Sequence, residues 1–392
     1  CSGVQTLGAT TQGAKRWIRP NGFAHPLDLK EKSTSDETSR ASRAQLNNRT
    51  YPDNLWRPIY PGIKTFSQRD NLIVTNKGPG SKGFDYCVSC GRIRPSETHE
   101  KLGNTHRIPF PTDFQNRDCS SSRISTGVLL GTTFESDVLL VRLAVSKPVE
   151  ILPGTPVTES AIRTMTEALT IAGTQLLELD SNEISGNFRA AFSVDEDLSN
   201  QIEIFLYDTT PGGAAYTSAI FDLGVNLFER AHAVLTDCNS NCDSACYDCL
   251  MSYTNRFDHG VLDRFLAADL LEHCMTGTIP KLSQQKFQRS LNSLLASLKD
   301  TELGSRIRPN SLLDGMISEM YVPLMIESGA KTHLFDLAHP LTPGIFNSHS
   351  LQQMADEFIP DPGTVLHAPI DVLRISEDLP GVVAEIIEKT KE

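Results

Sequence analysis

The sequence lacks the features of membrane and secreted proteins. No apolar run approaches the roughly 18 residues that a helix needs to cross a bilayer. The first residues, Cys1-Ser2-Gly3-Val4, contain neither the basic nor the apolar segment of a secretion signal. These absences predict a cytoplasmic protein without a membrane partner. Because cysteine stands where an initiator methionine is expected, we also expect the chain to be a fragment of a longer protein.

A nucleotide-binding motif of the form G-x-x-x-x-G-K-[ST] is also missing. The nearest stretch, Gly78-Pro79-Gly80-Ser81-Lys82-Gly83, has the wrong spacing and no helical pattern after it. No acidic strand end of the Walker B type is joined to a His or Asp pair either. The sequence therefore predicts that this chain is not catalytic by itself and does not hydrolyse ATP alone.

Composition and length indicate a folded protein whose charge is unevenly distributed. The 392 residues are 39% hydrophobic and 21% charged, which suits two or three globular domains. Residues 1–120 carry 18 Lys and Arg against 11 Asp and Glu, whereas the remainder carries 18 against 37. The N-terminal third is therefore the better candidate for contact with phosphate, with an ordinary solvated face as the alternative.

Apolar patterning predicts an α/β fold, with α+β as the alternative, in which a mixed sheet packs against helices. Strand-like runs cover residues 128–130, 138–145, 183–186 and 202–208. Apolar residues recur every three or four positions over residues 159–179, 214–235 and 260–275, which is typical of amphipathic helices. Further helices are expected around residues 284–299, 312–325 and 381–391.

We divide the chain into four segments on this basis. They are a loop-rich, basic N-terminal region (1–79), a putative zinc-binding segment (80–127), an α/β zinc-binding domain (128–275) and a mainly helical C-terminal region of unknown role (276–392). The second segment has too little apolar pattern to build a core by itself and needs a cross-link.

The strongest motif is Cys238-x3-Cys242-x3-Cys246-x2-Cys249. Zinc prefers four tetrahedral ligands, so four thiolates within twelve residues can enclose one ion and leave no open position for a reacting water. The motif therefore predicts a structural zinc site. A redox pair and two buried disulfides are the alternatives.

A second zinc site is predicted from Cys87, Cys90, Cys119 and one histidine. His106 is the first choice for the fourth ligand because it lies between the two groups of cysteines, and His99 is the alternative. If His106 is instead an ordinary surface imidazole, the fourth ligand comes from elsewhere or the site is degraded.

The glycine turn at residues 209–213, Thr-Thr-Pro-Gly-Gly, lies between a predicted strand and a predicted helix. A helix N-terminus at this position favours an anion such as phosphate, although tight packing is the usual reason for such glycines. A weaker hypothesis pairs Asp208 with Glu183 around a divalent ion, with a structural role as the alternative.

The sequence resembles the zinc-binding domain family named after the bacterial DNA-repair helicase MrfA. The resemblance rests on residues 205–216 (FLYDTTPGGAAY), the four-cysteine motif, the run Cys249-Leu250-Met251-Ser252-Tyr253 and the triplet Leu262-Asp263-Arg264, over roughly residues 80–275. It implies zinc on Cys238, Cys242, Cys246 and Cys249. Ala214 and Ala215 depart from the pattern, because we expect another glycine there.

The resemblance implies a role beside a DNA helicase. In this family the domain follows the two motor lobes of a superfamily 2 helicase or belongs to stand-alone partners of such helicases in phage defence. The first hypothesis is thus an accessory region of an ATP-dependent DNA helicase in DNA repair or phage defence, with DNA and a motor in cis or in trans as partners. The alternative is a stand-alone zinc-stabilised scaffold that recruits a helicase or nuclease; a zinc hydrolase is disfavoured by the all-cysteine ligands.

Overall fold

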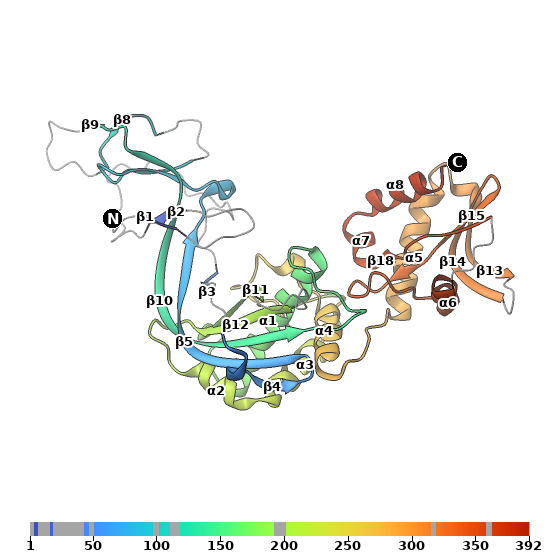
Figure 1. Ribbon diagram of the computed structural model, residues 1–392, viewed down its shortest axis with the longest axis horizontal. Coiled ribbons are helices and arrows are strands. Elements are labelled where there is room, and N and C mark those ends of the chain that lie inside the picture. Colours follow the sequence, from blue (N-terminus) through green and yellow to red (C-terminus); the bar gives the residue numbers. More distant parts are fainter. Residues whose placement is uncertain are drawn as a thin grey trace.

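The fold was analysed in a computed structural model. It describes residues 4–6, 16–18, 43–46, 51–96, 102–109, 118–191, 201–314, 319–357 and 363–391. Three parts follow one another along the long axis (Figure 1): an arm, a central α/β body and a C-terminal unit. No helix in these ranges combines the length and apolar character needed to cross a membrane.

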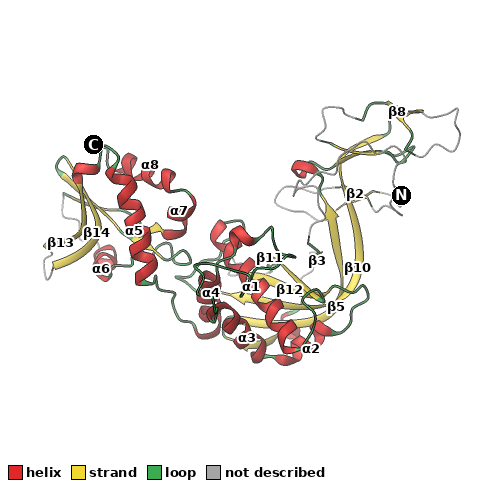
Figure 2. Cartoon of the chain, turned by 180° about the vertical axis from the view of Figure 1, so that it is seen from behind, coloured by secondary structure: helices red, strands yellow, loops and turns green. Residues whose placement is uncertain are grey.

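The sheet of the body is built around one long strand, β10 (Ile124–Ala144). Its C-terminal half pairs with β12 (Gln201–Asp208), which in turn pairs with β11 (Ile184–Ala190), all antiparallel. On its other side β10 pairs with β5 (Ile63–Asn76) from Leu143 to Leu130. Because β5 and β10 continue beyond the end of β12, they leave the body together as a two-stranded arm (Figures 1 and 2).

Short strands complete this sheet. They are β1 (Val4–Thr6), β2 (Arg16–Ile18), β3 (Gln45–Leu46), β4 (Arg57–Tyr60), β6 (Phe84–Cys87) and β7 (Ile93–Pro95). The segment divisions expected from the sequence stay predictions, and the one between residues 127 and 128 falls inside β10.

One face of the sheet carries the main core. Leu139, Val141 and Leu143 alternate along β10 toward α1 (Pro156–Leu176), α3 (Val225–Thr236) and α4 (Arg264–Thr276), and all three side chains are fully buried. Ile162, Met165, Leu169 and Ala172 of α1 share this core, as the helical period of the sequence predicts. The predicted α/β fold is confirmed.

The opposite face buries a charged network beneath residues 51–56. Glu203 is 1% exposed and accepts ion pairs from Arg142 (Nη2 to Oε1, 2.8 Å) and Arg189 (Nη2 to Oε2, 2.6 Å). The Arg142 guanidinium lies 4.0 Å from the ring centroid of Trp56. Each oxygen of the Glu203 carboxylate is therefore paired with an arginine, and a buried carboxylate needs such partners to offset the cost of removing it from water.

The glycine turn is organised by a carboxylate of the chain itself. Asp208 is fully buried, and its oxygens accept hydrogen bonds from the backbone N–H groups of Ala214 (2.7 Å), Tyr216 (3.0 Å) and Thr217 (2.9 Å) at the start of α2 (Tyr216–Leu223). Asp137 accepts from the N–H of Ala215 at 3.0 Å. The phosphate site suggested for this turn is therefore wrong, because aspartates occupy the anion position. Asp208 is likewise no partner for Glu183 in a metal site.

The single helix predicted over residues 214–235 is also wrong in part, because α2 ends and α3 begins at Gly224. The backbone of Gly224 has φ 57° and ψ −124°, a conformation outside the helical region. A Cβ there would lie 2.8 Å from the Nη2 atom of Arg57.

The C-terminal unit is a second, smaller α/β core. Helix α5 (Gln284–Lys299) and the terminal helix α8 (Leu379–Lys389) confirm two of the predicted helices. Between these helices the chain forms a four-stranded sheet of β13 (Ile307–Asp314), β14 (Glu319–Ser328), β15 (Lys331–Phe335) and β17 (Thr364–Leu366), in this order. The other elements are β16 (Leu337–Ala338), α6 (His349–Glu357), β18 (Ile370–Asp371) and α7 (Val372–Glu377).

The helix predicted over residues 312–325 is wrong, because this stretch forms parts of β13 and β14. Val322, Leu324 and Ile326 are buried at every second position, which is the period of a strand. Pro323 lies among them and has no N–H for a helical hydrogen bond. The C-terminal unit contacts the body through Leu341, which is buried in the main core.

Ala215 adopts a left-handed conformation with φ 62° at the start of α2. A side chain in this region costs about 1 kcal/mol, so we expect Ala215→Gly to leave the melting temperature of the body unchanged or raise it by a few degrees. Ala214→Gly is the matched control, because Ala214 does not have a positive φ. Glycine at this position raises the conformational entropy of the unfolded chain, so this variant should have a lower melting temperature. Differential scanning calorimetry that shows the reverse order would contradict this account of the turn.

Candidate metal centres

The first cluster comprises the four cysteines between α3 and α4. The sulfur of Cys238 lies 3.7 Å from that of Cys242 and 3.5 Å from that of Cys246, and Cys249 lies 3.7 Å from both Cys242 and Cys246. Tetrahedral zinc with Zn–S bonds of about 2.3 Å separates its sulfurs by about 3.8 Å. The four thiols are unpaired and already have the spacing that such an ion requires.

A tight turn at Cys246 sets the last two sulfurs. The carbonyl oxygen of Cys246 accepts from the N–H groups of Cys249 (3.2 Å), Leu250 (3.0 Å) and Met251 (2.9 Å), and the N–H of Cys246 donates to the sulfur of Cys249 (3.3 Å). Leu250 is fully buried in the main core directly after the last cysteine. The turn is thus anchored to the body at one end.

Arg264 joins the cysteine loop to the adjacent helix. It is 5% exposed and donates to the carbonyl oxygens of Leu235 (3.0 Å) and Thr236 (3.1 Å), the last residues of α3, and to that of Cys242 (3.2 Å). A cation here satisfies carbonyls that have no partner within the helix. Sequence reasoning noted the Leu262-Asp263-Arg264 triplet only as a family pattern and missed this positioning role.

The environment of the thiols favours different protonation states. Backbone N–H groups, first that of Cys242, lower the pKa of Cys238 to about 6. Burial, together with the neighbouring thiols, raises the pKa of Cys249 to about 12. A metal ion must therefore displace protons from part of the cluster when it binds.

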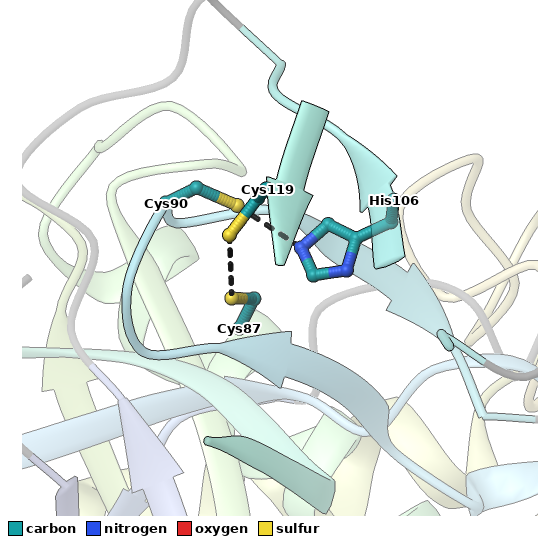
Figure 3. Close-up of side chains that lie close together, drawn as sticks. All are labelled: Cys87, Cys90, His106 and Cys119. Atoms are coloured by element: carbon teal, nitrogen blue, oxygen red, sulfur yellow. Dashed lines mark hydrogen bonds between the residues drawn. The ribbon is translucent and has the colours of Figure 1, made fainter. Parts of the chain in front are cut away.

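The second cluster lies at the end of the arm and is formed by two hairpins (Figure 3). Cys87 and Cys90 come from the turn between β6 and β7, whereas His106 and Cys119 come from β8 (Thr105–Arg107) and β9 (Asp118–Ser120). The two sulfurs of Cys87 and Cys119 are 3.9 Å apart, and the Cys90 sulfur is 3.2 Å from Nε2 of His106.

Strand register explains why His106 meets Cys119. The two residues are opposite one another in the antiparallel β8–β9 pair, so their side chains share a face. Nδ1 of His106 lies 2.8 Å from the carbonyl oxygen of Gly103, which directs Nε2 at the cysteines as in many metal-binding histidines. His99, the alternative ligand, lies outside the described residues.

The turn that presents Cys87 and Cys90 depends on Gly91. Its N–H donates to the carbonyl oxygen of Cys87 at 2.9 Å, and its φ is 76°, where a side chain is disfavoured. Both clusters supply four ligands and no open coordination position, so their donor sets suit structural zinc rather than catalysis. Within the described ranges, no third group of His, Cys, Asp or Glu side chains has comparable spacing.

The segment that holds the first cluster is similar to a known family. Residues 165–250 match the model of the MrfA Zn-binding domain, so the resemblance is confirmed over this segment, which contains all four cysteines of the first cluster but none of the second. A curated relative, Druantia protein DruE of Escherichia coli, is 31% identical over 250 residues. The match covers 60% of this chain and 13% of DruE.

Two solved structures also show similarity at 13% identity. A crystal structure of the DUF1998 helicase MrfA bound to DNA gives a TM-score of 0.35 and covers 60% of this chain and 25% of that one. A second, bound to DNA and AMPPNP, gives a TM-score of 0.26 and covers 51% and 22%.

We predict that the purified chain contains two zinc ions and that Cys246→Ser reduces this to one. Metal binding in such sites contributes about 10–16 kcal/mol to folding, so the same variant should unfold the body. Inductively coupled plasma mass spectrometry and thermal melting measure both effects. Cys274→Ala is the control, because Cys274 is a buried thiol outside either cluster; an unchanged melting temperature for Cys246→Ser would exclude a structural ion.

Zinc at the first cluster should be released as the pH falls. Protons compete for the thiolates, and at least one ligand, Cys249, has a raised pKa, so binding releases protons and acidification opposes it. We expect the apparent affinity to fall at least about tenfold per pH unit between pH 8 and 6. Titration with a chromogenic chelator measures this, and an affinity independent of pH would contradict thiolate ligation.

Proposed function

We propose that this chain is the zinc-binding accessory region of an ATP-dependent superfamily 2 DNA helicase, which supports the motor and its binding to DNA in DNA repair or phage defence. The observation that carries the proposal is the match of residues 165–250 to the MrfA Zn-binding domain, with four thiols at zinc spacing inside that segment. The motor lies in cis or in trans. The relation to DruE, a Druantia protein, supports phage defence as the setting.

Zinc would be held by two sets of ligands in this proposal. They are Cys238, Cys242, Cys246 and Cys249 in the body, and Cys87, Cys90, Cys119 and His106 in the arm. Each ion supplies a cross-link and no reacting group. The residues around the first site then fix the end of α3 against the start of α4 through Arg264, so that the surface of the body is rigid where a motor would contact it.

The four segments expected from the sequence form part of the proposal. The body and its cysteine loop are the accessory domain, and the arm and the basic N-terminal region approach DNA. The proposal assigns no function to the C-terminal unit.

The proposal is tested first in the gene and then in the protein. We expect helicase motor motifs in frame upstream of this sequence. A short complete reading frame beside a separate helicase or nuclease gene would instead favour the stand-alone scaffold.

We then expect Cys246→Ser, made in the full-length protein or its complex, to reduce ATP-dependent strand separation at least about tenfold. Basal ATP hydrolysis should remain, because the nucleotide site belongs to the motor. Strand displacement of a labelled duplex and a coupled ATPase assay measure the two activities, with Cys274→Ala as the control. Failure to detect ATP-dependent strand separation with the wild-type protein or complex would refute the helicase assignment.

A further inference from the structure

The arm tip, defined as the described residues within 82–96, 102–109 and 118–127, is basic, although the chain as a whole is acidic. It contains five Lys or Arg (Lys82, Arg92, Arg94, Arg107, Arg123) against two Asp (Asp85, Asp118). Asp85 is 4% exposed and accepts a hydrogen bond from Ser96, so it contributes little to the surface. The whole chain has a net charge of −12.

Three arginines lie on backbone segments that adjoin the second cysteine cluster. Arg92 follows the Cys87–Cys90 turn, and its Nη1 atom donates to the carbonyl oxygen of Arg107 at 3.1 Å. Arg107 directly follows the ligand candidate His106. Arg123 accepts a hydrogen bond from the N–H of Val88, inside the turn, through its carbonyl oxygen (3.0 Å). These hydrogen bonds connect the segments that carry the three arginines to one another and to the cysteine turn.

None of these guanidinium groups forms an ion pair with a carboxylate in the described part of the chain. Arg107 and Arg123 are exposed, and Arg92 is half-buried with only a neutral carbonyl as its partner. In contrast, Arg43, Arg142 and Arg189 of the body are each paired with carboxylates. Exposed arginines without counter-ions suit an external polyanion, since they lose no internal partner on binding.

We infer that the arm tip binds the phosphate backbone of duplex DNA. Among the described tip residues no aromatic ring is exposed, because Phe84 and Tyr86 are buried. The described tip residues therefore offer no platform for stacking on unpaired bases, whereas arginine contacts to phosphate need none. The arm also extends away from the acidic body (Figures 1 and 2), so a duplex can reach the tip with little repulsion.

The arrangement of the three arginines depends on the second cluster. The small apolar core described at the arm tip, around Phe84, Tyr86 and Val128, is formed by β6, β7 and β10 and includes no residue of β8 or β9. Cross-linking by Cys87, Cys90, His106 and Cys119 therefore positions the three arginines relative to one another. The inference deepens the proposed DNA-associated function and takes from it only the choice of DNA as the polyanion.

The test compares two triple variants of the full chain by fluorescence anisotropy with a 30-base-pair duplex. Arg92→Gln/Arg107→Gln/Arg123→Gln removes the tip charges. Arg289→Gln/Arg308→Gln/Arg374→Gln is the matched control, because it removes the same charge from exposed arginines of the C-terminal region. Each lost phosphate contact lowers the salt slope by about one. Between 50 and 200 mM salt, wild type should therefore lose about 40-fold more affinity than the tip variant.

Four outcomes would overturn the inference. They are equal duplex binding by the tip variant and wild type, equal losses in both triple variants, tighter binding to a single strand with the same number of phosphates, and equally tight binding to phosphatidylserine vesicles. Cys119→Ser should lose one metal ion and match the tip variant in duplex binding. Normal duplex binding by Cys119→Ser without that metal would show that the second cluster does not position the three arginines. These results are separate from strand separation, which tests the helicase assignment.

Discussion

Two parts of this chain combine a small hydrophobic core with a group of converging candidate metal ligands. The cysteine loop between α3 and α4 buries few apolar side chains, and the arm tip has only a small cluster around Phe84, Tyr86 and Val128. Burial at about 25 cal/mol per Å² cannot stabilise segments with so little apolar area. Zinc on the four thiols of the first cluster, and on the three thiols and His106 of the second, would supply the missing constraint in both places.

The two clusters achieve this by different routes. In the body, the cysteines are close in sequence, and Arg264 and Leu250 fix the loop to elements that are already packed. In the arm, the cysteine turn and the His106–Cys119 pair come from separate hairpins, so the cluster itself brings them together. Zinc at the first cluster would strengthen an existing domain, whereas zinc at the second would fix the shape of its module.

The elements that were predictable were those with a strong period or a strong motif. Helices α1, α5 and α8, strand β12 and the clustering of both ligand sets followed from residue spacing. Three features could not be predicted from the sequence, because each depends on tertiary contacts. Asp208 takes the anion position of the glycine turn, the backbone of Gly224 divides a continuous apolar pattern, and alternate burial in β14 needs the neighbouring strands.

Continuity of β10 has a mechanical consequence. Ile124 at the arm tip and Leu139 in the main core belong to one strand, and β5 is hydrogen-bonded to it over most of the distance between the two ends. The arm therefore has no flexible linker at its base. A force applied to the tip is therefore transmitted along β5 and β10 to the sheet that α1 covers.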